Sequence, residues 1–179
     1  ATTEIYTLSL HDALPILDRF IQMGMIAAKE AVTDSGLDIN NIDSHRFGVI
    51  VSSGIGGLGS IEKNYQTAEK RGFDRVSPFF IPMTISNLAA GHIAIAYHAQ
   101  GLCTCPVTAC AGGTNAIGDA FRNIRDGYQD VMIAGGCEAS VTPLGIGGFT
   151  SMKALSDATD PKRASIPFDK ERNGFVMGE

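Results

Sequence analysis

The sequence predicts an α/β protein whose sheet is mostly parallel. Apolar runs at 103–109 and 130–138 have the length and composition of strands, and residues 113–127 between them show a helical pattern. A strand, a helix and a second strand at this spacing form a right-handed βαβ unit, in which the two strands are parallel. A third apolar run at 47–53, rich in β-branched residues, adds a buried strand.

Before that third run the chain is expected to form one amphipathic helix. From Asp18 onwards apolar residues recur at helical spacing, and Gly36 stands where such a helix would stop. Residues 1–16 show no sustained period of either kind, and Pro15 interrupts them. They are left unassigned, as a disordered or artefactual segment, and the domain is taken to span residues 17–179.

Between the run at 47–53 and the βαβ unit, the sequence predicts a glycine-rich turn and three further elements. These are a polar helix at 60–71, an extended aromatic segment at 77–82 and a helix at 84–98. His92 and His98 belong to that last helix and are interpreted as a core residue and a surface residue.

Two expectations concern the second half of the chain. In the helix at 113–127, Ile117, Phe121 and Ile124 are expected to face the core. Near the end, residues 175–177 open an apolar strand whose partner the sequence does not contain. The chain is therefore expected to be part of a longer protein.

Composition and charge exclude several function classes. With 44% hydrophobic residues the chain can bury a core, and disorder is excluded as the default. The net charge of −5 gives no basic excess for a phosphate backbone, so nucleic acid is not expected as a partner. Runs of eighteen apolar residues and a secretory signal are absent from the sequence, so a cytoplasmic protein without membrane contact is expected.

Two sequence features, the cysteines and a glycine-rich motif, suggest metal or nucleotide binding but do not have the full pattern that either needs. The four cysteines match neither C-x-x-C nor a zinc spacing, so free thiols and no metal are expected. Residues 54–59 satisfy G-x-G-x-x-G, the dinucleotide fingerprint. The fingerprint also needs an acidic residue at the end of a second strand, and Asp74 lies where no strand is evident. A tight loop with positive φ is the preferred interpretation, and nucleotide binding stays as an alternative.

Cys110 is the candidate nucleophile. It falls between the strand at 103–109 and a helix that begins near Thr114, and the small residues 111–113 follow it. Small residues there allow a sharp turn that pushes the side chain outward, as in a nucleophile elbow. The helix dipole and unpaired N–H groups favour thiolate over thiol and can receive an oxyanion. A buried structural thiol remains open for Cys110, and is the interpretation for Cys103, Cys105 and Cys137.

A set of longer motifs is typical of one family. The motifs are DRFIQ at 18–22, DSGLDI at 34–39, SSGIGGLG at 52–59, SPFFIPMTISNLAAGHIAI at 77–95, VTACAGGTNAIGDAFR at 107–122, VMIAGGCEA at 131–139 and PFDKERNGFVMGE at 167–179. Through them the chain from about Asp18 to Glu179 resembles the N-terminal half of a condensing enzyme of the β-ketoacyl-[acyl-carrier-protein] synthase II type. That family belongs to the thiolase-like superfamily.

The resemblance implies a fold and a set of site residues. The fold is thiolase-like, with a mixed, mainly parallel sheet and flanking helices, present here as one of two pseudo-symmetric halves. Cys110 corresponds to the family's acyl-accepting cysteine. Ile55 and Phe80 correspond to residues that line the acyl pocket, and the basic residues Arg75 and Lys153 to positions beside its mouth where an acidic carrier protein docks.

The chain departs from the family at several positions. Residues 1–16 do not resemble it, and Ile166 stands where an arginine is usual. Gly112 replaces a serine or threonine, and Cys137 an alanine or threonine. The family's catalytic histidines, lysine and C-terminal phenylalanine belong to a second half that is not in this sequence, so the chain alone is expected to be inactive.

The implied activity of the intact protein is fatty-acid elongation by decarboxylative Claisen condensation. The acyl group of an acyl-carrier protein is condensed with a malonyl-carrier protein, which loses carbon dioxide, to give a 3-oxoacyl-carrier protein. The resemblance implies no cofactor or metal, and a homodimer. A polyketide-type ketosynthase shares these motifs and remains an alternative. So does a non-catalytic partner or dimerising fragment, although such chain-length-factor-like partners lack the cysteine that is present here as Cys110.

Overall fold

The computed structural model describes residues 16–179. Its sheet contains strands β1 (Phe47–Ser52), β2 (Cys103–Thr104) and β3 (Val131–Gly136), in the spatial order β2-β1-β3. Both pairings are parallel, which confirms the predicted sheet and the strands at its centre. Apart from Ile16, the unassigned segment 1–16 lies outside the described residues.

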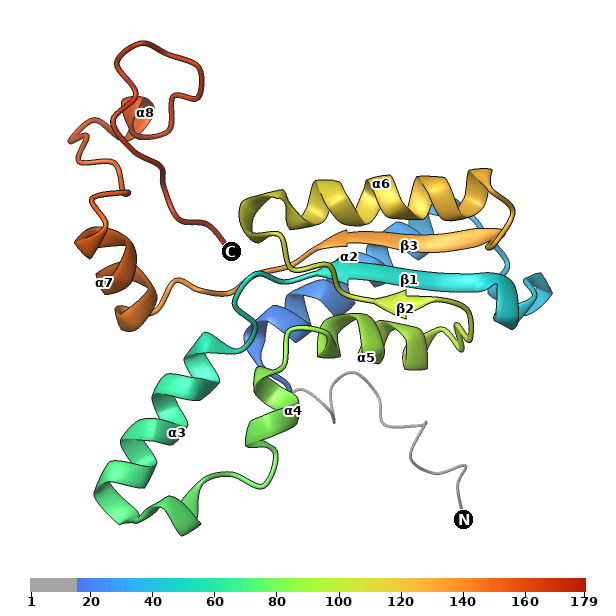
Figure 1. Ribbon diagram of the computed structural model, residues 1–179, viewed down its shortest axis with the longest axis horizontal. Coiled ribbons are helices and arrows are strands. Elements are labelled where there is room, and N and C mark those ends of the chain that lie inside the picture. The colour runs from blue at the N-terminus through green and yellow to red at the C-terminus, as the bar shows by residue number, and fades with distance from the viewer. Residues whose placement is uncertain (1–15) are drawn as a thin grey trace.

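The central strand β1 is buried on both faces. Alternate side chains of a strand point to opposite sides of the sheet. On one side Val49 and Val51 pack against α2 (Arg19–Ser35) and α5 (Leu88–Ala96). On the other side Ile50 packs against α6 (Gly112–Arg125), and Figure 1 shows the three layers, with α6 above the sheet and α5 below it.

The amphipathic helix expected from Asp18 is α2, and its ends are those that the sequence indicated. The Asp18 carboxylate accepts a hydrogen bond from the Phe20 N–H (3.2 Å), and Gly36 ends the helix with φ +64°. Asp18 also accepts hydrogen bonds from the N–H (3.1 Å) and hydroxyl (2.6 Å) of Ser60. Ser60 lies in the first turn of α3 (Leu58–Arg71), so one buried carboxylate joins the starts of two helices.

The remaining helices lie outside the three layers, as Figure 1 shows. They are α4 (Phe80–Thr84), α7 (Pro143–Ser151) and α8 (Pro161–Ala164), with short 3-10 helices at Ile39–Asn41, Ser44–Arg46, Phe73–Arg75 and Ala109–Ala111. Within residues 16–179, no helix has the length and apolar character needed to cross a lipid bilayer.

Two predicted extended segments are wrong in whole or in part. The strand expected at 103–109 is only the two residues of β2, because Pro106 has no N–H to continue the ladder. The aromatic segment at 77–82 is not extended: it enters α4 through Ser77, whose hydroxyl accepts from the N–H of Phe79 (3.2 Å). Pro82 is tolerated because it stands in the first turn, where the N–H has no intrahelical partner.

The predicted inner face of α6 is also wrong. Ile117, Phe121 and Ile124 are 57%, 62% and 44% exposed, whereas Ala116 and Ala120 are buried against the sheet. The helix lies so close to β1 and β3 that small side chains fill the contact. The large apolar residues that the helical pattern picked out lie on the other face.

The apolar segment at residues 175–177 has a backbone pairing partner. Phe175 forms a parallel bridge with Leu155: its N–H donates to the Ala154 carbonyl (3.0 Å) and its carbonyl accepts from the Ser156 N–H (2.9 Å). The Phe175 ring also meets Phe149 edge to face, with ring centres 5.2 Å apart. The expectation that this segment lacks a pairing partner within the sequence is therefore wrong for Phe175.

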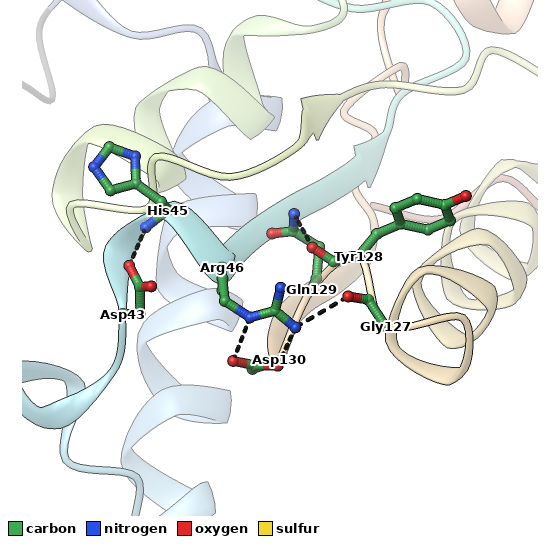
Figure 2. Close-up of polar contacts among 7 residues, drawn as sticks. All are labelled: Asp43, His45, Arg46, Gly127, Tyr128, Gln129 and Asp130. Carbon is green, nitrogen blue, oxygen red and sulfur yellow. Dashed lines mark hydrogen bonds and ion pairs between the residues drawn. The ribbon is translucent and has the colours of Figure 1, made fainter.

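An ion pair closes the end of the sheet where β1 and β3 begin. Figure 2 shows the Arg46 guanidinium between Asp130 and the carbonyl of Gly127. Its Nε donates to Asp130 Oδ2 (2.6 Å), and its Nη2 donates to Asp130 Oδ1 (2.5 Å) and to the Gly127 carbonyl (3.0 Å). The hydrogen bonds and charge of Arg46 lower the pKa of Asp130.

We expect Asp130→Asn to destabilise the protein at neutral pH and to have progressively less effect in acid. A carboxylate whose pKa is lower in the folded state contributes stability above its unfolded pKa, and loses it as the pH falls through the folded value. Urea unfolding at pH 7 and at pH 3 measures this, because an unperturbed aspartate titrates near pH 3.9.

The matched control is Arg46→Lys, which keeps the charge but not the two-point contact. It should lose part of the same stability at pH 7. A difference between Asp130→Asn and the wild type that grows as the pH falls would contradict the assignment.

Candidate active site

A cavity of about 450 Å³ opens at the end of the sheet where β1 and β3 finish. Its walls come from four parts of the chain: the end of β1 with the loop after it, the turn before α6, the residues after β3, and the C-terminal segment with α7. The lining residues are Ser52, Ser53, Gly54, Ile55, Ala109, Cys110, Gly113, Gly136, Cys137, Glu138, Ser140, Phe149, Phe175, Val176, Met177 and Gly178. In Figure 1 the C-terminal segment runs back towards the first turn of α6.

Cys110 lies at a strained turn that faces this cavity. It is exposed, and it sits in the 3-10 helix Ala109–Ala111 immediately before α6. The strain falls on the preceding residue, Ala109, whose φ is +49°, a left-handed conformation that an alanine rarely adopts. The sharp turn predicted for a nucleophile elbow is therefore present, and it brings the thiol to the positive end of a fourteen-residue helix.

The glycines after Cys110 serve close approach rather than an unusual backbone conformation. Gly112 is right-handed helical, with φ −57°, but a Cβ at this position would overlap the Ser52 hydroxyl. That hydroxyl is held in place because it donates to the Pro106 carbonyl (2.6 Å). Further along, the Cα of Gly113 lies 3.1 Å from the position that a Cβ on Gly136 would take. The Ser52 hydroxyl therefore leaves no room for a side chain at position 112.

The other three thiols differ from Cys110 in their surroundings. Burial, helped by the neighbouring Glu138 carboxylate, raises the pKa of Cys137 to about 12. Partial removal of water from around the sulfur also raises the pKa of Cys103 and of Cys105. Cys105 is half-buried like Cys137, but Cys103 is exposed on the two-residue edge strand β2, so the prediction of a buried structural thiol is wrong there.

The glycine-rich loop after β1 forms one wall of the cavity. Gly56 has φ +73°, as the tight-loop interpretation required, and the Ile55 side chain lines the cavity that Cys110 also lines. Asp74 lies in the 3-10 helix Phe73–Arg75 and not at the end of a strand. The loop therefore lacks the second half of a dinucleotide fingerprint and brings an apolar side chain to the thiol's cavity.

Glu138 is a site residue that the sequence analysis did not find. Its Oε2 accepts hydrogen bonds from the N–H groups of Gly54 (2.8 Å) and Ile55 (3.0 Å), and its Oε1 accepts from the Ser53 hydroxyl (3.2 Å). The only signal in the sequence was a carboxylate just after an apolar strand, at the edge of the sheet where functional groups gather.

Three predicted site residues do not line the cavity. Phe80 is on α4, and Arg75 pairs with Asp74 (3.5 Å) beyond the end of α3. The fourteen residues of α3 span about 20 Å. The start of α7 is tied to the opposite end of α3, where Glu62 accepts from the hydroxyl of Thr142 (2.6 Å). Lys153 follows α7, and neither of the two basic residues lines the cavity.

The described residues supply no obvious base for Cys110. The cavity lining, as far as residues 16–179 define it, contains no histidine. His92 is half-buried in α5, where burial lowers its pKa, and His98 follows that helix with φ +53°. Within the same range, no cluster of three His, Cys, Asp or Glu side chains is placed to hold a metal ion.

Comparison with known proteins gives consistent matches. The model of the β-ketoacyl synthase N-terminal domain family matches residues 7–179. The 3-oxoacyl-[acyl-carrier-protein] synthase 2 of Synechocystis sp. is 49% identical over 164 residues, which are 91% of this chain and 39% of that protein. The enzyme of the same name from Coxiella burnetii is 49% identical over 90% of this chain and 39% of its own. The chain thus spans about two fifths of the length of these relatives.

Solved structures agree with the fold. A type II polyketide synthase acyl-carrier protein in complex with its ketosynthase, bound to the hexaketide, aligns with TM-score 0.83 and 32% identity, covering 88% of this chain and 40% of that chain. A β-ketoacyl synthase from Burkholderia phymatum aligns with TM-score 0.75 and 27% identity, over 90% of this chain and 40% of that chain. The thiolase-like architecture with a parallel sheet and flanking helices is confirmed.

We expect Cys110 to be the first thiol alkylated when the folded protein meets iodoacetamide briefly at pH 7. Relative to an ordinary thiol value of 9.0, a pKa of about 12 reduces the thiolate fraction of Cys137 about a thousandfold. Mass mapping of the cysteine peptides measures the order of labelling. Cys103 is the informative comparison because it too is exposed, and labelling of Cys103 as fast as Cys110 would refute the prediction.

We expect Gly112→Ala to destabilise the fold by about 1–3 kcal/mol, because the added Cβ meets the Ser52 hydroxyl. Gly118→Ala is the matched control on the same helix. Nothing lies within 4 Å of a Cβ there, so helix propensity should stabilise that variant by about 0.5–1 kcal/mol.

Thermal unfolding of both variants tests the contact, and the double variant Ser52→Gly/Gly112→Ser tests its cause. The double variant should recover most of the stability that a side chain at position 112 alone costs, because the volume added at position 112 is removed at position 52. Equal stability of Gly112→Ala and Gly118→Ala would show that α6 has room to move away from β1.

Proposed function

We propose a function from one premise: the chain belongs to the β-ketoacyl synthase family, as its N-terminal domain. The protein that contains it extends fatty acyl chains, by condensing an acyl-carrier protein with a malonyl-carrier protein to give a 3-oxoacyl-carrier protein. The observation that carries this proposal is Cys110, exposed at a strained turn before α6 on a cavity with apolar walls.

The first half of the reaction is an acyl transfer to Cys110. Its thiolate attacks the thioester carbonyl, the bond to the carrier thiol breaks, and that thiol leaves with the electron pair and takes a proton. The thiol stands at the N-terminus of α6, and the apolar side chains around the cavity suit a hydrocarbon chain. We assign Ile55, in the loop after β1, to the wall of the site that holds the acyl chain.

The second half needs groups that we place outside this chain. Malonyl-carrier protein loses carbon dioxide, the resulting enolate attacks the acyl carbon, and the Cys110 thiolate leaves. The enolate needs positive or hydrogen-bond donating groups. The described part of the cavity wall has no histidine, and the chain spans about two fifths of its relatives, which supports this division.

We also propose a partner and an assembly. We assign acyl-carrier protein as the partner because a related ketosynthase was solved in complex with one. Arg75 and Lys153 are exposed cations that suit an acidic carrier, although they lie apart in the fold. Phe80 is proposed to reach an acyl chain only in a larger assembly. We further propose a cytoplasmic homodimer for the protein that contains the chain.

A polyketide-type ketosynthase is the second candidate. It is favoured by the structural match to a ketosynthase bound to a hexaketide, which has a higher TM-score and identity than the Burkholderia synthase. The identity of 49% to the 3-oxoacyl-carrier protein synthases favours fatty-acid elongation. The presence of Cys110 argues against a non-catalytic partner.

A chimera tests the proposal. Residues 17–179 replace the matching part of the Synechocystis enzyme, and the chimera is incubated with an acyl-carrier protein and then with malonyl-carrier protein. We expect the acyl group on the Cys110 peptide by mass spectrometry, followed by a single two-carbon extension. The unfused 179-residue chain should release no carbon dioxide from malonyl-carrier protein.

The controls are Cys110→Ala and Cys103→Ala in the same chimera. The first should abolish acyl transfer because the acceptor is gone, whereas the second should leave it intact. Acylation that persists in Cys110→Ala would sink the proposed role of this thiol. Repeated extension to a poly-β-ketone would support the polyketide alternative.

A further inference from the structure

The backbone N–H groups of three successive loop residues converge on two side chains. Those of Gly54 and Ile55 donate to one oxygen of Glu138, and that of Gly56 donates to the Ser53 hydroxyl (3.0 Å). The Ser53 hydroxyl in turn donates to the other Glu138 oxygen. Glu138 therefore holds the whole turn after β1, directly or through Ser53.

This arrangement is both tight and charged. A Cβ on Gly54 would lie only 2.9 Å from Glu138 Oε2, so the loop backbone lies directly against the carboxylate. Hydrogen bonds to an ionised acceptor are about twice as strong as neutral ones. Successive N–H groups that point at one anion form a nest, which fixes the conformation of the loop that contains them.

The loop held in this way carries the one large apolar side chain between the glycines. Ile55 is 39% exposed and lines the cavity of Cys110, while its own N–H is one of the two bound to Oε2. Both carboxylate oxygens of Glu138 accept hydrogen bonds from the loop.

We propose that Glu138 is a positioning residue that determines the length of the hydrocarbon chain that the Cys110 thiol accepts. It fixes the turn at residues 54–56, and the turn fixes Ile55 as a wall of the cavity. The identification of that chain as an acyl group rests on the proposed function. The effect of Glu138 on the cavity does not.

The test uses alkyl methanethiosulfonates, from methyl to octyl, on the 179-residue chain. The thiolate attacks the sulfenyl sulfur, a disulfide to the alkyl group forms, and methanesulfinate leaves with the electron pair. The rate at the Cys110 peptide is followed by mass and divided by the rate with glutathione. The readout is the ratio of octyl to methyl rates.

In Glu138→Ala we expect this ratio to change by about tenfold, the discrimination that one methylene produces in a fitted pocket, with the methyl rate within about twofold of wild type. Glu138→Gln should keep the wild-type ratio, because its amide oxygen can accept both N–H groups. Glu138→Asp keeps the charge but withdraws it from the loop, and should behave like the alanine variant.

Ile55→Ala completes the design. If Glu138 acts through Ile55, adding Glu138→Ala to Ile55→Ala should change the ratio no further. Should Glu138→Ala fail to fold, as judged by circular dichroism, the aspartate and glutamine variants still decide. An unchanged ratio in Glu138→Asp, or equal ratios in the aspartate and glutamine variants, overturns the proposal.

The outcome is separate from that of the chimera experiment. Disulfide formation with these reagents needs neither a carrier protein nor condensation, so a shifted ratio together with an inactive chimera would remove the proposed function and leave the role of Glu138. An active chimera with an unshifted ratio would remove only the role of Glu138.

Discussion

Six consecutive residues of β1, Phe47–Ser52, are buried, so water reaches neither face of this strand. A strand of this kind is stable only between two layers of helices, and the parallel pairing with β2 and β3 directs the ends of β1 and β3 to one edge. Loops that follow parallel strands meet at that edge. Cys110, the Gly54–Gly56 turn and Glu138 come together for this reason, although the chain separates them by dozens of residues.

The same edge contains two thiols in different surroundings within one cavity. Cys110 precedes a helix and is exposed, whereas Cys137 follows β3, is half-buried and stands next to a carboxylate. Burial and the neighbouring Glu138 carboxylate raise the pKa of Cys137, so residue type alone does not determine how a thiol behaves at this edge. The strained turn at Ala109 is compatible with this design because the close contacts of Gly112 and Gly113 with the sheet hold the turn in place.

Much of this fold could be predicted from the sequence, and the failures have physical causes. The strands at 47 and 131 and the helix α2 with its stop at Gly36 follow from local patterns that agree with the final packing. The predicted strand at 103–109 is interrupted at Pro106, and the predicted extended segment at 77–82 is wrong because Ser77 begins a turn that leads into α4: its carbonyl accepts from the N–H of Phe80 (2.9 Å). The prediction for the inner face of α6 is wrong because the close packing of this helix on the sheet favours alanine, and the sequence analysis looked for large apolar residues. Cys110 was found because its turn is local. Glu138 was not, since its partners lie more than eighty residues away.

The contact between Ser52 and Gly112 also bears on how this family diverges. The two positions share one small volume between β1 and the first turn of α6, so a side chain gained at one must be lost at the other. A lineage that carries serine or threonine at position 112 is then expected to carry glycine at position 52, and the two sites should covary along a phylogeny as a pair. The single substitutions would be disfavoured steps, and passage between the two states would require a temporarily less stable ancestor or an accompanying shift of the helix.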